Sequence, residues 1–379
     1  MSLQFITGGS GAGKSEYLSR LVCEESVRRP HDNFIVVVPE QYTMETQKKL
    51  VHMHSRKGIL NIDVVSFERL AYKVFEELGG GNRPVLDDTG KNLIVRRVLE
   101  KEKKKLDYFG SSIEKTGFVS ELKSVISELL QYGITPQQLG EIGENVKEKQ
   151  QLSAKLKDIR LVYEEFMAFL STNYITSEEI LDVLCGLVEK SKLIAGSEII
   201  FDGFTGFTPI QYKLMRLLLV YSKSIKISVT IDKKERLTGH EGWNNLFFMS
   251  KEMMNRLIAI CEEEGINVDD TVCVDRDINY RYEGAKDLAY LERNLFRYKD
   301  GVYTGTPENI RIYEGSNPKE ELQYIVSEIL QLTRKEGFRY RDIAVVTADL
   351  ETYGKVAANM MKQNDIPAFL DYKRSVASN

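Results

Sequence analysis

A glycine-rich loop near the start of the chain constrains the fold more than any other feature of the sequence. Residues 8–15 read GGSGAGKS and fit the pattern GxxxxGK[ST]. An apolar segment at 3–7 precedes the loop, and the apolar spacing of a helix begins at Lys14. In this strand–loop–helix order, glycines let backbone N–H groups surround phosphates, and the helix dipole favours their negative charge. The sequence therefore predicts an α/β fold built around a nucleotide-binding loop.

The loop predicts a site for ATP and Mg²⁺. In such loops the lysine, here Lys14, contacts the β- and γ-phosphates, and the hydroxyl of Ser15 is a ligand of Mg²⁺. A second, carboxylate ligand is expected at the end of a later apolar strand, and Asp202 follows such a segment at 199–201. The predicted nucleotide-binding residues are Gly8, Gly9, Ser10, Gly11, Ala12, Gly13, Lys14, Ser15 and Asp202, with Ser15 and Asp202 as the Mg²⁺ ligands.

The residue after Asp202 bears on catalysis. A hydrolysing motor usually has a glutamate there, which orients the attacking water, whereas this chain has Gly203. Loss of such a base costs on the order of 10²–10⁴ in rate. We therefore assign no catalytic residue and expect ATP to be bound with weak or no hydrolysis.

Apolar periodicity divides the chain into three parts. Strand and helix patterns alternate over 1–80 and 190–304, which indicates a parallel sheet covered by helices. Between them, 81–189 follows a Gly/Pro-rich breaker and shows almost only helical periodicity, so it is predicted to be an all-helical insertion. The last part, 305–379, is predicted to be half of a second doubly wound unit, with helices at 318–336 and 350–364 and strands at 310–314, 342–347 and 366–370.

Charge and cysteine content exclude several protein classes. There are 52 Lys and Arg against 56 Asp and Glu, and the net charge of -4 excludes a uniformly basic nucleic-acid binder but not a local basic channel. The four cysteines have no CxxC spacing and form no zinc pattern with the four histidines, which predicts reduced thiols in a cytoplasmic protein. No signal peptide and no apolar run of roughly 18 residues is recognised, so a membrane association is not predicted.

Four motifs in order resemble those of a known family. Besides the glycine-rich loop, VPEQYT occupies 38–43 and VSFERLA occupies 65–71. The run DGFTGFTPIQ at 202–211 stands where a UvrD-like superfamily 1 helicase has DExQDxxxxQ. Together they resemble the AddB family, the B subunits of bacterial AddAB (RexAB) helicase–nucleases, over essentially the whole chain.

The resemblance implies a RecA-like P-loop NTPase architecture. It implies that 1–80 plus 190–304 form helicase-like domain 1A, that 81–189 form the helical insertion 1B, and that 305–379 begin a truncated domain 2A. Family members are longer and carry a C-terminal nuclease domain with an iron–sulfur cluster, so this chain is expected to be an N-terminal fragment without either.

The resemblance also implies a role and partners. In this family the B subunit has degenerate motor motifs and scans single-stranded DNA for the Chi sequence, while an AddA-like helicase–nuclease subunit drives translocation. The expected role is double-strand-break repair by homologous recombination in the cytoplasm, in a heterodimer acting on single- and double-stranded DNA.

Side chains that follow the predicted strands are candidates for contacts with single-stranded DNA. Open α/β sheets bind ligands beyond the carboxyl ends of their strands, and single strands are held by aromatic stacking with polar and cationic groups. Each aromatic residue is equally compatible with a core position, and the arginine with a solvated helix surface. The candidates are Gln41, Thr43, Phe67, Arg69, Tyr72, Phe204 and Phe207.

Two other hypotheses stay open on the sequence. One is a P-loop phosphotransferase, a kinase of a small molecule, which requires an acceptor pocket and an arginine-rich lid that no sequence pattern reveals. The other is a non-catalytic scaffold whose vestigial loop binds no nucleotide.

Overall fold

A computed structural model describes residues 1–79, 84–115, 117–146, 149–176, 179–237, 239, 242–297 and 301–370. The chain divides into two units, Met1–Gly301 and Val302–Asn379. The first unit contains a seven-stranded sheet in the order β3-β2-β6-β7-β1-β8, with β9 also paired to β1. Its strands are β1 (Ser2–Gly8), β2 (Asn33–Val37), β3 (Ile62–Val65), β6 (Ser197–Phe201), β7 (Ser224–Thr230), β8 (Asn267–Val268) and β9 (Val272–Cys273).

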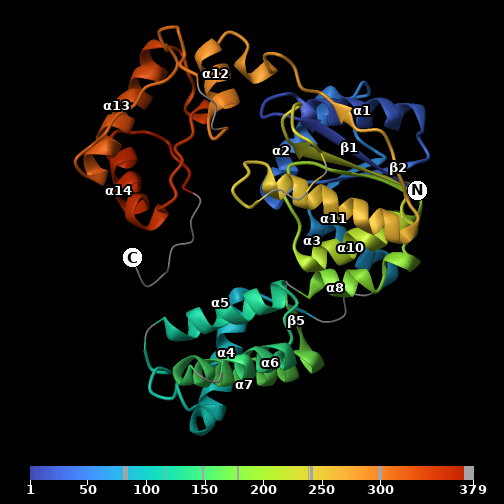
Figure 1. Cartoon of the computed structure of the whole chain (residues 1–379), viewed down its shortest axis with the longest axis vertical. Coiled ribbons are helices and arrows are strands. Elements are labelled where there is room, and N and C mark those ends of the chain that lie inside the picture. The colour runs from blue at the N-terminus through green and yellow to red at the C-terminus, as the bar shows by residue number, and fades with distance from the viewer. Residues whose placement is uncertain are drawn as a thin grey trace. The chain divides into compact units, whose positions relative to one another are not determined.

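The sheet is parallel in every strand pairing that the described residues make, which confirms the predicted α/β class. Its central strands are short runs of β-branched and aromatic residues because both faces are covered by helices. Helices α1 (Lys14–Arg28) and α2 (Thr43–Met53) pack on one face, against Phe34 and Val36. The opposite face, with Ile35 and Val37, is covered by helices from later in the chain (Figure 1). These are α3 (Phe67–Leu78), α8 (Ile180–Cys185), α10 (Pro209–Tyr221) and α11 (Phe248–Glu264).

The segment between α3 and β6 is mostly helical, as predicted. It has a core of its own, centred on Leu99, Ile126 and Phe166, and two short parallel strands accompany the helices. The insertion is therefore not all-helical. Its elements are β4 (Val85–Leu86), α4 (Asp88–Glu102), α5 (Phe118–Gln131), α6 (Pro136–Asn145), α7 (Gln150–Asn173) and β5 (Ile175–Thr176).

The end of this segment packs with the sheet rather than with the insertion. The apolar spacing over 177–190 predicts a helix, but α8 covers only Ile180–Cys185, and 177–178 lie outside the described residues. Ile180 and Leu184 belong to the apolar cluster beneath the sheet. The breaker predicted at 79–84 falls partly outside the described residues, which include Gly79 and Pro84 but not 80–83.

Other boundaries shift by a few residues. The sequence pattern predicts a helix over 242–264, which begins at Phe248, and a strand over 267–274, which is divided into β8 and β9. The remaining short elements are α9 (Lys192–Ala195), α12 (Lys286–Asn294) and 3-10 turns at Glu40–Tyr42, Lys103–Lys105, Val188–Lys190, Tyr280–Tyr282 and Tyr340–Asp342. Within the described part of the chain, no helix has the length and apolarity needed to cross a membrane.

The second unit contains two packed helices. Helices α13 (Pro318–Lys335) and α14 (Leu350–Gln363) share an apolar cluster, which confirms the two predicted helices. The three strands predicted at 310–314, 342–347 and 366–370 are wrong, because these segments form no ladder in the described chain. A parallel strand needs a hydrogen-bonded neighbour and apolar cover on both faces. Here Ile312, Val346 and Phe369 are 95%, 90% and 90% exposed.

Candidate nucleotide-binding site

The glycine loop, residues 8–13, connects the end of β1 to the start of α1. Gly11 and Gly13 have φ values of +72° and +95°, in a region that strains residues with a Cβ. Because Gly13 is also the N-cap of α1, the first turn of this helix has no side-chain cap. The loop thus ends at a helix terminus whose N–H groups and positive dipole favour an anion.

Lys14 is folded back onto the loop. Its Nζ donates to the carbonyl oxygens of Gly8 and Gly9, both at 2.9 Å. Burial lowers the pKa of Lys14, and the nearby carboxylates of Asp202 and Asp275 oppose that shift. The ammonium is therefore partly desolvated and is held by neutral carbonyls, which a phosphate can replace.

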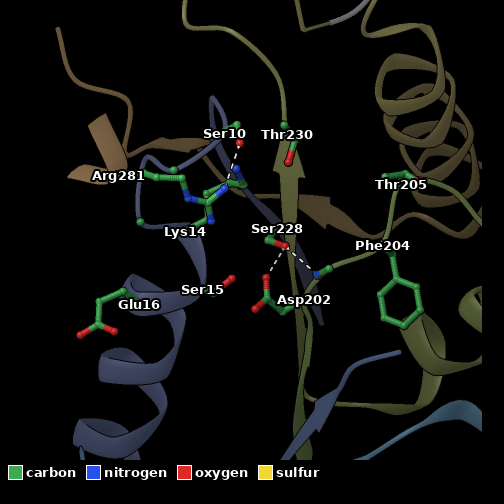
Figure 2. A pocket seen from close by; sticks show the side chains of 13 residues that line it. Ser10, Lys14, Ser15, Glu16, Asp202, Phe204, Thr205, Ser228, Thr230 and Arg281 are labelled. Atoms are coloured by element: carbon green, nitrogen blue, oxygen red, sulfur yellow. Dashed lines mark hydrogen bonds between the residues drawn. The ribbon is translucent and has the colours of Figure 1, made fainter. Parts of the chain in front are cut away.

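The loop lines a cavity of about 340 Å³, and the residues that follow β6, beginning with Asp202, line it as well. Figure 2 shows the hydroxyl of Ser15, on α1, facing the carboxylate of Asp202. A hydroxyl and a carboxylate are ligands that Mg²⁺ prefers, and Mg²⁺ in such sites takes its other ligands from waters and phosphates. No group of three or more His, Cys, Asp or Glu residues is placed to hold a metal within the described residues. The donor set therefore fits Mg²⁺ bound together with a nucleotide.

Asp202 is oriented by a hydroxyl on the neighbouring strand. The Oγ of Ser228, on β7, donates to Asp202 Oδ1 at 2.6 Å and accepts from the Gly203 N–H at 3.3 Å (Figure 2). The Asp202 N–H in turn donates to the carbonyl of Val37 at 3.1 Å. The carboxylate is thus fixed from β2 and β7 together. Sequence reasoning missed Ser228, since nothing marks it among the alternating residues of its strand.

The position after Asp202 is built for glycine. Gly203 has φ +86°, and a Cβ there meets Pro39 Cδ at 3.4 Å. Glu16 is the other carboxylate that lines the cavity, and its two oxygens pair with Arg20 and Lys49, each at 3.0 Å. The hydrogen bond from Lys49 is the main cause that lowers the pKa of Glu16. A carboxylate held in this way is a poor proton acceptor.

The structure adds an arginine that sequence spacing did not indicate. Arg281 lines the cavity, and its Nη1 donates to the hydroxyl of Ser10 at 3.4 Å. It is brought there because β9 pairs with β1, in the register Ile6–Val272 and Thr7–Cys273. No local pattern could have found it, because the contact joins residues 271 positions apart.

Two of the candidate DNA contacts have buried side chains. Phe67 is 7% exposed, and its ring centroid lies 5.4 Å from that of Phe204 and 6.1 Å from that of Phe207. Thr43 is 5% exposed, and its hydroxyl donates to the Glu40 carbonyl at 2.9 Å. In this conformation Phe67 is part of the core, and the half-buried Phe204 and Phe207 pack against it. Thr43 is the first residue of α2.

The other three candidates are exposed, in the turn after β2 and on α3, which follows β3. Gln41 lies in the turn that follows β2, and Tyr72 is 42% exposed on α3. Arg69 is exposed on α3 too, and its Nε lies 3.1 Å from Glu40 Oε1. The structure therefore leaves a polar and aromatic surface at the carboxyl edge of β2 and β3.

Comparison with known proteins matches this sequence to a family. The family model described as "ADDB, N-terminal" matches residues 5–292. The chain belongs to the AddB family. One relative of this AddB-family chain, named as the B subunit of an ATP-dependent helicase/deoxyribonuclease of Lachnoclostridium phytofermentans, is 42% identical over 100% of this chain and 33% of its own length.

Two further relatives carry the same name. The protein of Caldanaerobacter subterraneus is 36% identical over 100% of this AddB-family chain and 32% of its own length, and that of Clostridioides difficile is 35% identical over 100% and 33%. The chain spans about a third of the length of these curated relatives. The iron–sulfur cluster is expected only in longer family members, outside these residues, and it stays a prediction.

Proposed function

We propose that this chain binds ATP with Mg²⁺ at the glycine loop and forms the N-terminal, helicase-like part of the B subunit of an ATP-dependent helicase/deoxyribonuclease. The observation that carries the proposal is the cavity lined by Lys14, Ser15 and Asp202, in which the Ser15 hydroxyl faces the Asp202 carboxylate. A triphosphate with Mg²⁺ needs an ammonium, N–H groups at a helix start, a hydroxyl and a carboxylate. The words "ATP-dependent" in the names of the relatives support the choice of nucleotide.

We expect this site to hold ATP with weak or no hydrolysis. Gly203 replaces the usual water-orienting glutamate, and its left-handed backbone disfavours any side chain. Glu16 is engaged by two cations and has a lowered pKa. The guanidinium of Arg281 adds a positive charge to the cavity, which favours binding of the phosphates.

The domain assignment is also a proposal. Residues 1–80 and 190–304 are assigned to domain 1A of a P-loop NTPase, 81–189 to insertion 1B and 305–379 to the start of domain 2A. The packing of α8 with the sheet supports a 1B boundary nearer residue 179. The full-length subunit is proposed to act with an AddA-like helicase–nuclease subunit on DNA in double-strand-break repair by recombination, with Chi scanning as the role of this part.

Single-stranded DNA is proposed to lie along the carboxyl edge of β2 and β3. Gln41, Arg69 and Tyr72 are exposed there and supply hydrogen-bonding, cationic and stacking groups. Fluorescence anisotropy with a labelled oligonucleotide tests this surface. Loss of one stacked base in Tyr72→Ala is worth about 1–3 kcal/mol. The matched control is Tyr132→Ala, at another exposed tyrosine, which lies in the insertion. Equal effects of both variants would refute the assignment.

Calorimetric titration with ATP and Mg²⁺ tests the nucleotide site. Lys14→Ala removes a charged donor to the phosphates, and a hydrogen bond to a charged group is worth about 1.5–3 kcal/mol, or roughly 10- to 150-fold in affinity. Lys223→Ala is the control, because Lys223 pairs with Asp32 and does not line the cavity. Absence of binding by the unaltered chain, or equal affinity of Lys14→Ala, would show that the loop is not an ATP site.

A further inference from the structure

A segment from late in the first unit lies against the glycine loop. Residues 275–283, here called the strap, follow β9 directly. The Val274 N–H donates to the Thr7 carbonyl at 2.9 Å, which extends the pairing of β9 with β1 up to the strap. Because β1 runs straight into the glycine loop, this pairing carries the strap to the backbone of the loop.

Asn279 is the buried residue of the strap. It is 4% exposed, although its side chain is polar. Its Oδ1 accepts from the Arg276 N–H at 3.0 Å, and its Nδ2 donates to the Ser10 carbonyl at 3.3 Å. The amide therefore closes a turn within the strap and contacts the loop at the same time.

A second hydrogen bond joins the strap to the next peptide of the loop. The Arg281 N–H donates to the Gly11 carbonyl at 3.3 Å. The carbonyls of Ser10 and Gly11 are consecutive, so the strap holds both toward itself. In a trans peptide the C=O and N–H groups point in opposite directions, and the Gly11 N–H therefore points away from the strap.

The orientation of these carbonyls matters for an anion. A loop that binds phosphate presents N–H groups to it, and a carbonyl turned toward the phosphate repels it. Ser10 and Gly11 line the cavity, so their carbonyls are the groups that must be turned away from a bound nucleotide. The strap supplies the partners that keep them in that orientation before any nucleotide arrives.

The approach of the strap accounts for two glycines of the loop. A Cβ on Gly9 meets Asn279 Nδ2 at 3.1 Å, and a Cβ on Gly11 meets Arg281 Cβ at 2.4 Å. The second distance is too short for any side chain on Gly11 unless the strap moves. These glycines thus make room for the strap as well as for phosphates.

We propose that Asn279 is a positioning residue for nucleotide binding, which holds the Ser10 carbonyl away from the cavity and keeps the glycine loop in its anion-binding shape. The proposal rests on ATP binding at this loop. A loop that is ordered in advance loses less conformational entropy when its ligand binds. Loss of the Asn279 hydrogen bond to Ser10 therefore lowers the affinity for ATP although Asn279 itself does not contact the nucleotide.

Asn279→Ala tests the proposal, with Asn255→Ala as the matched control. The Asn255 amide also donates to a backbone carbonyl, that of Gly239 at 3.1 Å, but it lies on α11 and does not line the cavity. Two quantities are measured for each variant: the Kd for ATP with Mg²⁺, and hydrogen–deuterium exchange of the glycine-loop amides without ATP. We expect Asn279→Ala to weaken ATP binding about tenfold, the equivalent of one hydrogen bond, and to speed exchange in the loop.

The outcomes separate this proposal from the proposed function. If the unaltered chain binds ATP but Asn279→Ala binds it equally well, or binds it less well without faster exchange in the loop, the positioning role is overturned and ATP binding stands. If the unaltered chain binds no ATP, the proposed function and this role both fail. Should Asn279→Ala not fold, Asn279→Asp keeps the acceptor for Arg276 and removes the donor to Ser10. Faster loop exchange in that variant supports the role, and unchanged exchange overturns it.

Discussion

The hydroxyl of Ser228 allows the most direct test of Asp202 as a ligand of the proposed Mg²⁺. It donates to Asp202 Oδ1 at 2.6 Å, within the range of a short hydrogen bond to a charged oxygen. Ser228→Ala removes this donor and the acceptor of the Gly203 N–H at 3.3 Å, while Asp202 itself is kept. The carboxylate is then free to rotate away from Ser15 and from a metal between them.

The expected loss follows from the strength of that contact. A hydrogen bond to a charged group contributes about 1.5–3 kcal/mol, and loss of a partner that orients a metal ligand typically costs about 10- to 100-fold in metal affinity. We therefore expect calorimetric titration of Ser228→Ala to show ATP bound about 10- to 100-fold more weakly in the presence of Mg²⁺. In excess EDTA the variant and the unaltered chain should bind ATP alike.

The control is a second serine, Ser197, at the start of β6, the strand that ends just before Asp202. Ser197 is 0% exposed, and its hydroxyl donates to the Ile194 carbonyl at 2.9 Å, so Ser197→Ala removes a buried hydroxyl outside the cavity. The reasoning is refuted if Ser228→Ala binds Mg²⁺–ATP normally, or if its affinity falls by the same factor with and without Mg²⁺.

Three further changes test the electrostatics and the backbone of the site. Because burial lowers the pKa of Lys14 below its ordinary 10.5, ATP affinity should fall as the pH rises through that lowered pKa; Lys14→Ala should show no such fall in calorimetry. Gly203→Glu should gain no ATPase activity and should lose about 1–2 kcal/mol in urea unfolding, because its φ of +86° is left-handed; activity at a motor's level would contradict this. Burial raises the pKa of Glu292, so Glu292→Gln should raise Tm at pH 7, where the charged form is costly, and the gain should vanish toward pH 4. A lower Tm at pH 7 would mean that the ion pair of Glu292 with Arg297 at 3.7 Å outweighs burial.

The part of the site that could be predicted from the sequence is the part encoded locally. The glycine loop, Lys14 and Ser15 form one unbroken strand–loop–helix segment, and Asp202 follows an apolar run that forms β6, as expected of a metal-side acid. Each of these positions is fixed by its immediate neighbours in the chain. Local pattern was therefore sufficient to single these residues out, whereas the adjacency of β6, β7 and β1 in the sheet brings Asp202 to the loop.

The rest depends on pairings that no local pattern encodes. Arg281 reaches the cavity through the pairing of β9 with β1. The side on which an aromatic ring packs is equally non-local: Phe67 starts α3 as expected, yet its ring turns into the core. The segments around Ile312 and Val346 have the β-branched character of strands, but without a paired neighbour and cover on both faces they stay exposed and extended.

The place of β1 in the sheet has a consequence for how the polypeptide folds during synthesis. β1 is complete at Gly8, yet the strands that pair with it begin only at Ser224 in β7, Asn267 in β8 and Val272 in β9. At about 5–20 residues per second, a ribosome needs roughly 10 to 50 s to make the chain between Gly8 and Val272. Such distant pairing is slow to form, because the chain loses the entropy of closing a long loop before the strand contacts can stabilise it. The glycine loop therefore leaves the ribosome long before the strands that pair with β1, and its neighbours are completed only when those strands have been made.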